Sequence, residues 1–170
     1  MSLRYQCTHC DFTQRVRHEA RVYEKEEPGC LRPILWSAWC NLCRKVVDAE
    51  RVPTLQELED HIESARRDPY AERKLFTYWP PEEEISVTLR YIEWRKIRVA
   101  PSRCFECGGH DLHFPETSYG NLPCPLCSGE MEAHLTMIGG AFTRFAAAVY
   151  SLEGELITPG EAPEEWLMNY

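Results

Sequence analysis

The 170-residue sequence lacks the features that mark membrane and secreted proteins. No run approaches the ~18 apolar residues that a membrane-spanning helix needs, and the most apolar window, residues 145–150, is far shorter. The chain opens with Met1-Ser2-Leu3-Arg4, without the basic and apolar segments of an export signal. These absences predict a cytoplasmic protein with no membrane partner.

Sequence motifs of catalysis are also missing. The chain has no His-Glu-x-x-His, no phosphate-cradling glycine loop and no pattern of a nucleophile with its base. The acidic run Glu82-Glu83-Glu84 fits the solvated first turn of a helix better than an acidic active site. The sequence therefore predicts a protein that is not an enzyme.

Positive charge is scarce, with a formal net charge of −8 that is concentrated after residue 100. By count of the sequence, residues 1–50 carry +1, residues 51–100 carry −1 and residues 101–170 carry −8. Acidic surfaces repel phosphate, so nucleic acid is disfavoured as a partner and another protein is preferred. A phosphate-binding face remains an alternative, although a scattered set of solvated charges is the preferred interpretation. Such a face would combine Arg15, Arg17 and Arg21 with the cations before the third motif, which are Arg95, Lys96, Arg98 and Arg103.

Cysteine, in contrast, is abundant. Eight of the nine cysteines form four Cys-x-x-Cys motifs: Cys7/Cys10, Cys40/Cys43, Cys104/Cys107 and Cys124/Cys127. In a reducing compartment such motifs more often bind metal than form disulfides, and each supplies half of a tetrahedral shell. Redox-active thiols are the alternative, but thioredoxin-like chemistry needs a βαβ context that the sequence does not show. The ninth, Cys30, is interpreted as a core residue in preference to a reactive thiol.

Pairing motifs that are neighbours in the sequence closes the shorter loops. It predicts one site from Cys7/Cys10 with Cys40/Cys43 across 29 residues, and another from Cys104/Cys107 with Cys124/Cys127 across 16 residues. Four thiolates fill each site, so the metal is expected to stabilise the structure and not to catalyse. Nearby histidines, His9, His110 and His113, are then interpreted as loop or surface residues and not as ligands.

The segments 104–109 (CFECGG) and 124–129 (CPLCSG) resemble the zinc-ribbon group of folds, in which two cysteine-bearing turns hold one zinc beside a small antiparallel sheet. Gly108 suits the positive φ that such a turn often needs after its second cysteine. The first two motifs depart from this pattern, with Asp11 and Arg44 at that position. The resemblance implies two Zn²⁺ per chain. Rubredoxin-like iron sites use the same turns, and only the Cys124 motif has their proline, so zinc is preferred to iron.

Secondary-structure signals surround the motifs. Short strands are expected at residues 3–5, 12–16, 34–36 and 46–47, which places the first two motifs at turns between extended segments. A helix is expected over residues 54–67, where Thr54 and Glu57 form a capping box. A second helix is expected to begin at Pro80-Pro81, with a strand over residues 85–91 as the alternative. Its expected apolar stripe is Ile85, Leu89, Ile92 and Val99.

After the last motif a strand is expected over residues 133–138. Residues 141–150 fit a helix, while residues 149–157 also fit two strands about Glu153-Gly154. The expected fold is α+β, with two small antiparallel zinc-ribbon-like units joined by a helical segment. The expected divisions are 1–52 for the first ribbon, 53–100 for the helical connector, 101–140 for the second ribbon and 141–170 for an extension.

These features favour a metal-stabilised interaction protein or adaptor. The alternatives are a nucleic-acid-binding zinc-ribbon protein, and an enzyme or redox protein with a rubredoxin-like iron site. Four tryptophans are candidate contacts if exposed, although core packing is the preferred interpretation of each: Trp36, Trp39, Trp79 and Trp94.

Overall fold

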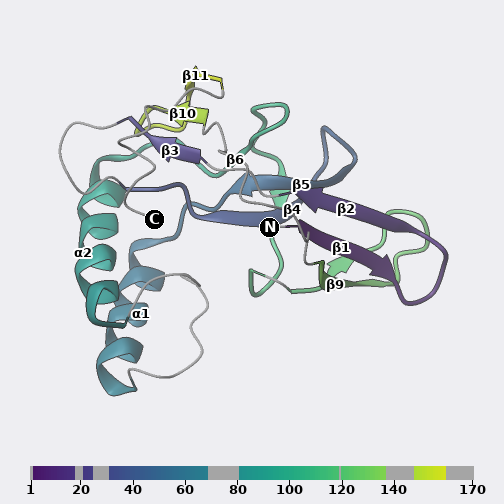
Figure 1. Ribbon diagram of the computed structural model, residues 1–170, viewed down its shortest axis with the longest axis horizontal. Coiled ribbons are helices and arrows are strands. Elements are labelled where there is room, and N and C mark those ends of the chain that lie inside the picture. Colours follow the sequence, from purple (N-terminus) through teal and green to yellow (C-terminus); the bar gives the residue numbers. More distant parts are fainter. Residues whose placement is uncertain are drawn as a thin grey trace. The chain divides into compact units, whose positions relative to one another are not determined.

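The computed structural model describes residues 2–17, 21–24, 31–68, 81–118, 120–136 and 148–159. Within these ranges the chain is α+β: its sheets are mostly antiparallel and it has two helices (Figure 1). Neither helix is long and apolar enough to cross a membrane. The fold class agrees with the sequence prediction.

Two compact units divide the chain, and each is assembled from three separate segments. The first unit consists of Met1–Ala20, Leu35–Arg51 and Ser102–Ala147, and it contains all four Cys-x-x-Cys motifs. The second unit consists of Arg21–Ile34, Val52–Pro101 and Ala148–Tyr170. These units do not coincide with the consecutive divisions expected from the sequence, because segments distant in the chain share a sheet.

The first sheet of the first unit has the strand order β2-β1-β9-β8, with every neighbouring pair antiparallel. Its strands are β1 (Ser2–Cys7), β2 (Thr13–Arg17), β8 (Leu122–Pro123) and β9 (Glu130–Thr136). In β1, Leu3, Tyr5 and Cys7 are buried while Arg4 and Gln6 are exposed. This alternation gives the sheet one apolar and one polar face. The expected strand at residues 133–138 is the described end of β9.

The second sheet of this unit has the order β6-β5-β4-β7. A central antiparallel hairpin of β4 (Leu35–Cys40) and β5 (Lys45–Glu50) is flanked by the short strands β6 (Arg103–Cys104) and β7 (Leu112–His113). Both hairpin strands are buried on both faces over most of their length. Trp36 is in this core, with Arg51 and Phe114 against its ring.

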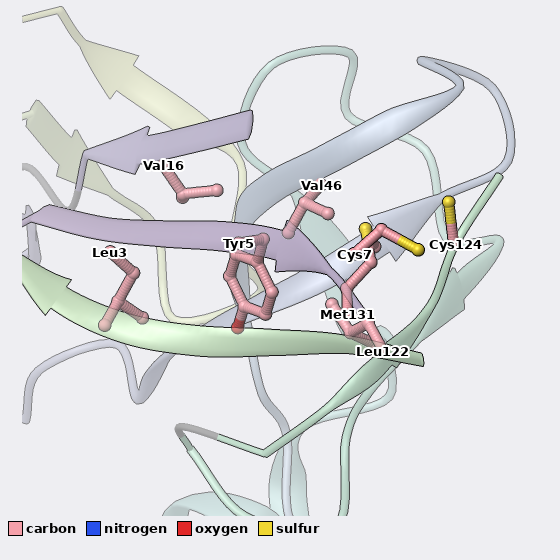
Figure 2. Close-up of a cluster of buried hydrophobic side chains, with 8 residues drawn as sticks. All are labelled: Leu3, Tyr5, Cys7, Val16, Val46, Leu122, Cys124 and Met131. Carbon is pink, nitrogen blue, oxygen red and sulfur yellow. The ribbon is translucent and has the colours of Figure 1, made fainter. Parts of the chain in front are cut away.

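The two sheets meet through a shared core and a polar link. Val46 of β5 packs with Leu3, Tyr5, Val16 and Met131 of the first sheet, as Figure 2 shows. The Gln14 side chain of β2 donates to the Val46 carbonyl and accepts from the Val46 amide at 3.0 Å. This amide pairing supplies hydrogen bonds to a stretch of β5 backbone that would otherwise be buried without them.

In the second unit, helix α1 (Leu55–Arg67) begins where its sequence predicts. Thr54 caps it: its Oγ1 accepts from the Glu57 amide at 3.1 Å, and Glu57 Oε2 accepts from the Thr54 amide at 2.7 Å. Helix α2 (Pro81–Ile97) also begins at the predicted proline, so the strand alternative over residues 85–91 is wrong. The two helices pack against each other.

The buried face of α2 differs from the expected apolar stripe. Ile92 is buried, but Leu89 is 48% exposed and Val99 is 90% exposed. The buried positions include Glu84, Thr88 and Tyr91. Each of the three has a hydrogen-bond partner: Glu84 Oε1 lies 2.7 Å from His61 Nε2 of α1, Thr88 donates to the Glu84 carbonyl, and Tyr91 donates to the Arg32 carbonyl. Hydrogen-bonded polar groups and a large aromatic side chain are buried on this face of α2. A pattern of aliphatic residues alone therefore could not predict which face is buried.

A small sheet of order β11-β10-β3 completes the second unit. It comprises β3 (Arg21–Tyr23), β10 (Ala148–Tyr150) and β11 (Leu156–Thr158). β10 and β11 are antiparallel, and the Gly154 amide in their connection donates to the Ser151 carbonyl at 2.8 Å. The interpretation of residues 149–157 as two strands is confirmed. The expectations for Cys30, Trp79 and residues 141–147 lie outside the described residues.

Candidate metal centres

Each Cys-x-x-Cys motif occupies the connection between two strands. The first connects β1 to β2, the second β4 to β5, the third β6 to β7 and the fourth β8 to β9. The sequence prediction that the first two motifs lie at turns between extended segments is confirmed. Strand ends fix each turn on both sides, so the sheet determines where the sulfurs lie.

The structure gathers the eight sulfurs into two groups of four. The first cluster is Cys7, Cys10, Cys124 and Cys127, and the second cluster is Cys40, Cys43, Cys104 and Cys107. In each group all candidate ligand atoms lie within 4.8 Å of one another. All eight predicted site residues are therefore brought together, four at a time.

The predicted grouping of the motifs is wrong. The structure pairs the first motif with the fourth and the second with the third, whereas sequence neighbours were expected to pair. The expected ribbon units 1–52 and 101–140 depend on that pairing, and in the structure each instead supplies one motif to each cluster. The difference in loop-closure entropy is too small to decide the grouping. The observed loops of 113 and 60 residues cost only roughly 1 kcal/mol more each than the expected 29 and 16.

Strand pairing explains the observed grouping. β1 is antiparallel to β9, with Cys7 opposite Met131, so the end of β1 meets the start of β9 just after Cys127. In the second sheet, Cys40 of β4 is opposite Leu112 of β7, and Ala49 of β5 is opposite Cys104 of β6. These ladders bury many backbone hydrogen bonds and apolar side chains, which outweighs the small difference in closure entropy.

The sulfur spacing fits a tetrahedral ion. In the first cluster Cys7 Sγ lies 3.5 Å from Cys127 Sγ, and Cys10 Sγ lies 3.7 Å from Cys124 Sγ. In the second cluster the distances are 3.7 Å for Cys40–Cys107 and 3.8 Å for Cys43–Cys104. A tetrahedron with metal–sulfur bonds of about 2.3 Å has edges of about 3.8 Å. A disulfide needs about 2.0 Å, and all eight cysteines are free thiols.

Backbone amides turn toward the sulfurs. The His9 amide donates to Cys7 Sγ at 3.3 Å, the Gly109 amide to Cys107 Sγ at 3.4 Å, and the Cys43 amide to Cys40 Sγ at 3.5 Å. Such bonds stabilise thiolate charge and orient the ligands around a metal. Both clusters therefore have the environment that a thiolate-bound cation needs.

The residue after the second cysteine has positive φ in three motifs. These are Gly108 (71°), Ser128 (57°) and Arg44 (52°), and each amide donates to the carbonyl of the first cysteine of its motif. Arg44 thus adopts the turn that its side chain disfavours. Asp11 is not among the described residues with positive φ, and the first motif closes instead with a bond from the Cys7 amide to the Phe12 carbonyl.

Two glycines allow the motifs of one cluster to approach closely. A Cβ at Gly129 would lie 2.7 Å from His9 Nδ1, and a Cβ at Gly109 would lie 2.4 Å from Leu42 Cδ1. Both glycines follow the second cysteine of a motif by two positions, and both partners are the second intervening residue of the opposing motif. The third and fourth motifs have this glycine and the first and second do not. Each cluster combines one motif that has this glycine with one that lacks it, and this sequence signal could have argued against pairing sequence neighbours.

Burial and ionisation differ within a cluster. Cys7, Cys40, Cys104 and Cys124, the first cysteines of their motifs, are buried, while Cys107 and Cys127 are exposed. The His9 amide lowers the pKa of the Cys7 thiol to about 6, and burial raises the pKa of the Cys104 thiol to about 11. Four adjacent sulfurs without a cation cannot all be thiolates, because their charges repel. A divalent cation at each centre removes that conflict.

The nearby histidines are not in either cluster, as the sequence predicts. His9 Nδ1 is 2.8 Å from Thr8 Oγ1, His110 Nδ1 is 2.9 Å from the Ser102 carbonyl, and His113 Nε2 is 3.2 Å from Asn41 Nδ2. Within the described residues, the two cysteine clusters are the only groups of three or more potential ligands that converge in this way.

The fold and its two clusters define an α+β chain with two candidate four-cysteine metal centres, consistent with zinc-knuckle-like units. Comparisons with family models, curated proteins and solved structures found no match to this chain. The assignment of function therefore depends on the residues themselves.

Proposed function

We propose that this chain binds two structural Zn²⁺ ions and acts as a metal-stabilised interaction protein that is not an enzyme. The observation that supports it best is the convergence of eight thiols as two sets of four, each with the spacing of a tetrahedral shell. Such a shell leaves no position for water or substrate, whereas a catalytic zinc keeps one open. The ions would then hold the fold together.

The topology requires the metal ions to join segments that are distant in the sequence. The first cluster joins residues 7–10 to residues 124–127, so one ion would connect the first and third segments of the first unit. Its third segment, Ser102–Ala147, reaches the two clusters through strands of only two residues, β6 and β8. Short strands supply few hydrogen bonds and little buried area, and metal coordination supplies the missing stability.

A shell of four thiolates suits both zinc and iron, and zinc is proposed because only the Cys124 motif has the proline of rubredoxin-like turns. Metal analysis of the chain purified without added metal distinguishes them. We expect two equivalents of zinc per chain, colourless protein, and loss of tertiary structure on chelation. One equivalent, a coloured iron-loaded protein, or a fold that is unchanged after complete removal of metal would each contradict part of this proposal.

Two sets of residues bear on how a partner is bound. Trp36 and Trp94 are buried, which agrees with core packing, and Trp39 is partly buried. Arg95 and Arg98, two members of the alternative phosphate-binding face, donate to carbonyl oxygens through their guanidinium groups, which argues against that alternative. Arg98 is only 3% exposed, with its guanidinium 4.9 Å from the centre of the Trp94 ring. A binding surface has to be sought elsewhere.

A further inference from the structure

Three arginines gather on the exposed face of the first sheet. Arg4 belongs to β1, and Arg15 and Arg17 belong to β2 (Figure 1 shows the two strands side by side). All three side chains are exposed. Arg4 is directly opposite Arg15 in the antiparallel register, and Arg17 is two residues along the same face from Arg15. We call these three residues the arginine face.

This arrangement is unfavourable for the free protein. Side chains directly opposite each other on antiparallel strands have Cβ atoms about 5 Å apart, and like charges at that distance repel. On the other side of Arg4, the register places His134 of β9, which adds no negative charge. Within the described residues, none of the three arginines forms an ion pair or a side-chain hydrogen bond. No ion pair among the described residues offsets the repulsion.

Protection of a sheet edge explains only part of the arginine face. β2 is an edge strand, and charged residues on edge strands discourage pairing with other chains. Edge protection accounts for Arg15 and Arg17. It does not account for Arg4, because β1 lies between β2 and β9. An arginine placed opposite another arginine within the sheet indicates an anionic ligand that binds both.

The surroundings of the arginine face limit the size of that ligand. The exposed acidic residues Asp11, Glu130 and Glu132 lie toward the motif end of the same strands and turns, with Glu132 opposite Gln6. A long polyanion would meet these carboxylates. Among the described residues of β1, β2 and β9, no exposed Phe, Tyr or Trp offers a surface on which a nucleic-acid base could stack. The first unit carries a formal charge of only −1, against −7 for the second.

We propose that the arginine face binds a short acidic segment of a partner protein through Asp or Glu carboxylates. A guanidinium group presents two parallel N–H donors that match the two oxygens of one carboxylate, and a carboxylate between Arg4 and Arg15 neutralises their repulsion. This inference rests on the proposed interaction role and names the chemistry of the partner. It does not depend on which metal occupies the clusters.

The test is fluorescence anisotropy of a fluorescein-labelled hexaglutamate peptide, titrated with metal-loaded full-length protein at low salt. The variant Arg4→Gln/Arg15→Gln/Arg17→Gln should bind at least about 10-fold more weakly. A control, Arg66→Gln/Arg67→Gln/Lys96→Gln, removes the same charge from exposed helical positions and should leave affinity within about twofold. Replacing the arginine face by three lysines should give an intermediate loss, because charge remains and the two-pronged geometry does not.

Thermal stability gives a second measurement, in which the substitution should increase stability while it decreases peptide affinity. Arg4→Gln alone should weaken peptide binding and raise the Tm of the free protein by about 2 °C, because it removes the like-charge pair. A purely structural role for Arg4 predicts a lower Tm. Metal content, measured on every variant, separates this test from that of the metal-stabilised fold.

Three outcomes overturn the inference. They are no binding of the peptide by the native sequence, equal losses in the arginine-face variant and the helical control, and tighter arginine-dependent binding of a 20-base-pair DNA duplex than of the peptide. The last outcome would assign the face to a nucleic-acid backbone instead. In all three cases, two retained equivalents of metal would leave the proposed structural role of the clusters intact.

Discussion

The ring of His9 lies directly over Gly129, the residue two positions after Cys127. A Cβ on Gly129 would stand 2.7 Å from His9 Nδ1 and 3.1 Å from His9 Cβ. The first and fourth motifs are thus in contact through these two residues as well as through their sulfurs. Thr8 adds to this contact, since its amide donates to the Glu130 carbonyl at 3.0 Å.

Replacement of Gly129 should therefore loosen the first cluster. We expect Gly129→Ala to lower the free energy of unfolding by about 1–3 kcal/mol, because the added methyl group overlaps the base of the His9 side chain. Urea unfolding measures the effect. The double variant His9→Ala/Gly129→Ala should recover most of the loss, and strictly additive effects would show that the contact is unimportant.

Gly109→Ala is a matched comparison in the second cluster. Its Cβ would lie 2.4 Å from Leu42 Cδ1, which is the mobile end of an exposed side chain. Leu42 can rotate away more easily than the His9 ring can. We expect a smaller loss of stability than for Gly129→Ala, and a larger loss would contradict this comparison.

Serine substitutions can distinguish the observed grouping from pairing of sequence neighbours. Cys7→Ser/Cys124→Ser removes two ligands from one cluster, so the chain should retain one equivalent of metal. Cys7→Ser/Cys40→Ser removes one ligand from each cluster and should weaken both. Metal analysis after dialysis against a weak chelator measures the retained ions. The opposite pattern would restore the grouping of neighbours.

Metal binding should release protons. In the ion-free first cluster, Cys10 has a pKa raised to about 12: a bond from the Phe12 amide lowers it, but burial and the adjoining sulfurs raise it more. The pKa of Cys127 is also raised, because the neighbouring Cys7 sulfur outweighs the Gly129 amide that lowers it. Both thiols are protonated at neutral pH and must become thiolates to bind a cation.

The sign of the pH dependence follows from this proton release. At least two protons leave the first cluster per ion, so affinity rises with pH and metal is lost on acidification. Calorimetry in buffers of different ionisation enthalpy counts the released protons. Binding without proton release near neutral pH would show that the four sulfurs are already ionised.

Arg44 should be replaceable by glycine with a gain in stability. Its φ of 52° is unfavourable for a residue with a Cβ, by about 1 kcal/mol. We expect Arg44→Gly to raise the free energy of unfolding by about 0.5 kcal/mol, since greater freedom of the unfolded chain offsets part of the gain. In the control Arg66→Gly, within helix α1, the same replacement should destabilise by about 1 kcal/mol.

The second unit depends on a buried polar pair. His61 Nε2 of α1 lies 2.7 Å from Glu84 Oε1 of α2, and both side chains are almost fully buried. Removing one member leaves the other in an apolar environment, so Glu84→Ala should cost about 3 kcal/mol of unfolding free energy. The neighbouring Glu83→Ala, at an exposed position, is the control and should change it by less than about 0.5 kcal/mol. Equal effects of the two substitutions would contradict the assigned role.

Local signals in the sequence identified the candidate metal ligands and the helices. The spacing of Cys7 and Cys10 is sufficient to predict a ligand-bearing turn, and Thr54 with Glu57 is sufficient to begin α1 at Leu55. These predictions succeeded because each depends on residues within one turn of the chain. The sequence also indicated that His110 and His113 are not ligands, because four thiolates already complete a shell.

Only the tertiary structure decided which motifs share a centre, which face of α2 is buried, and that Arg4 is opposite Arg15. Each depends on strand register or helix packing between segments that are distant in the sequence. Many long-range contacts determine the free-energy difference between the possible arrangements. The loop-closure free energies of the two motif groupings differ by only roughly 1 kcal/mol per loop. Residue spacing identified the eight thiols, and the pairing of β1 with β9 assigned Cys7 to Cys127.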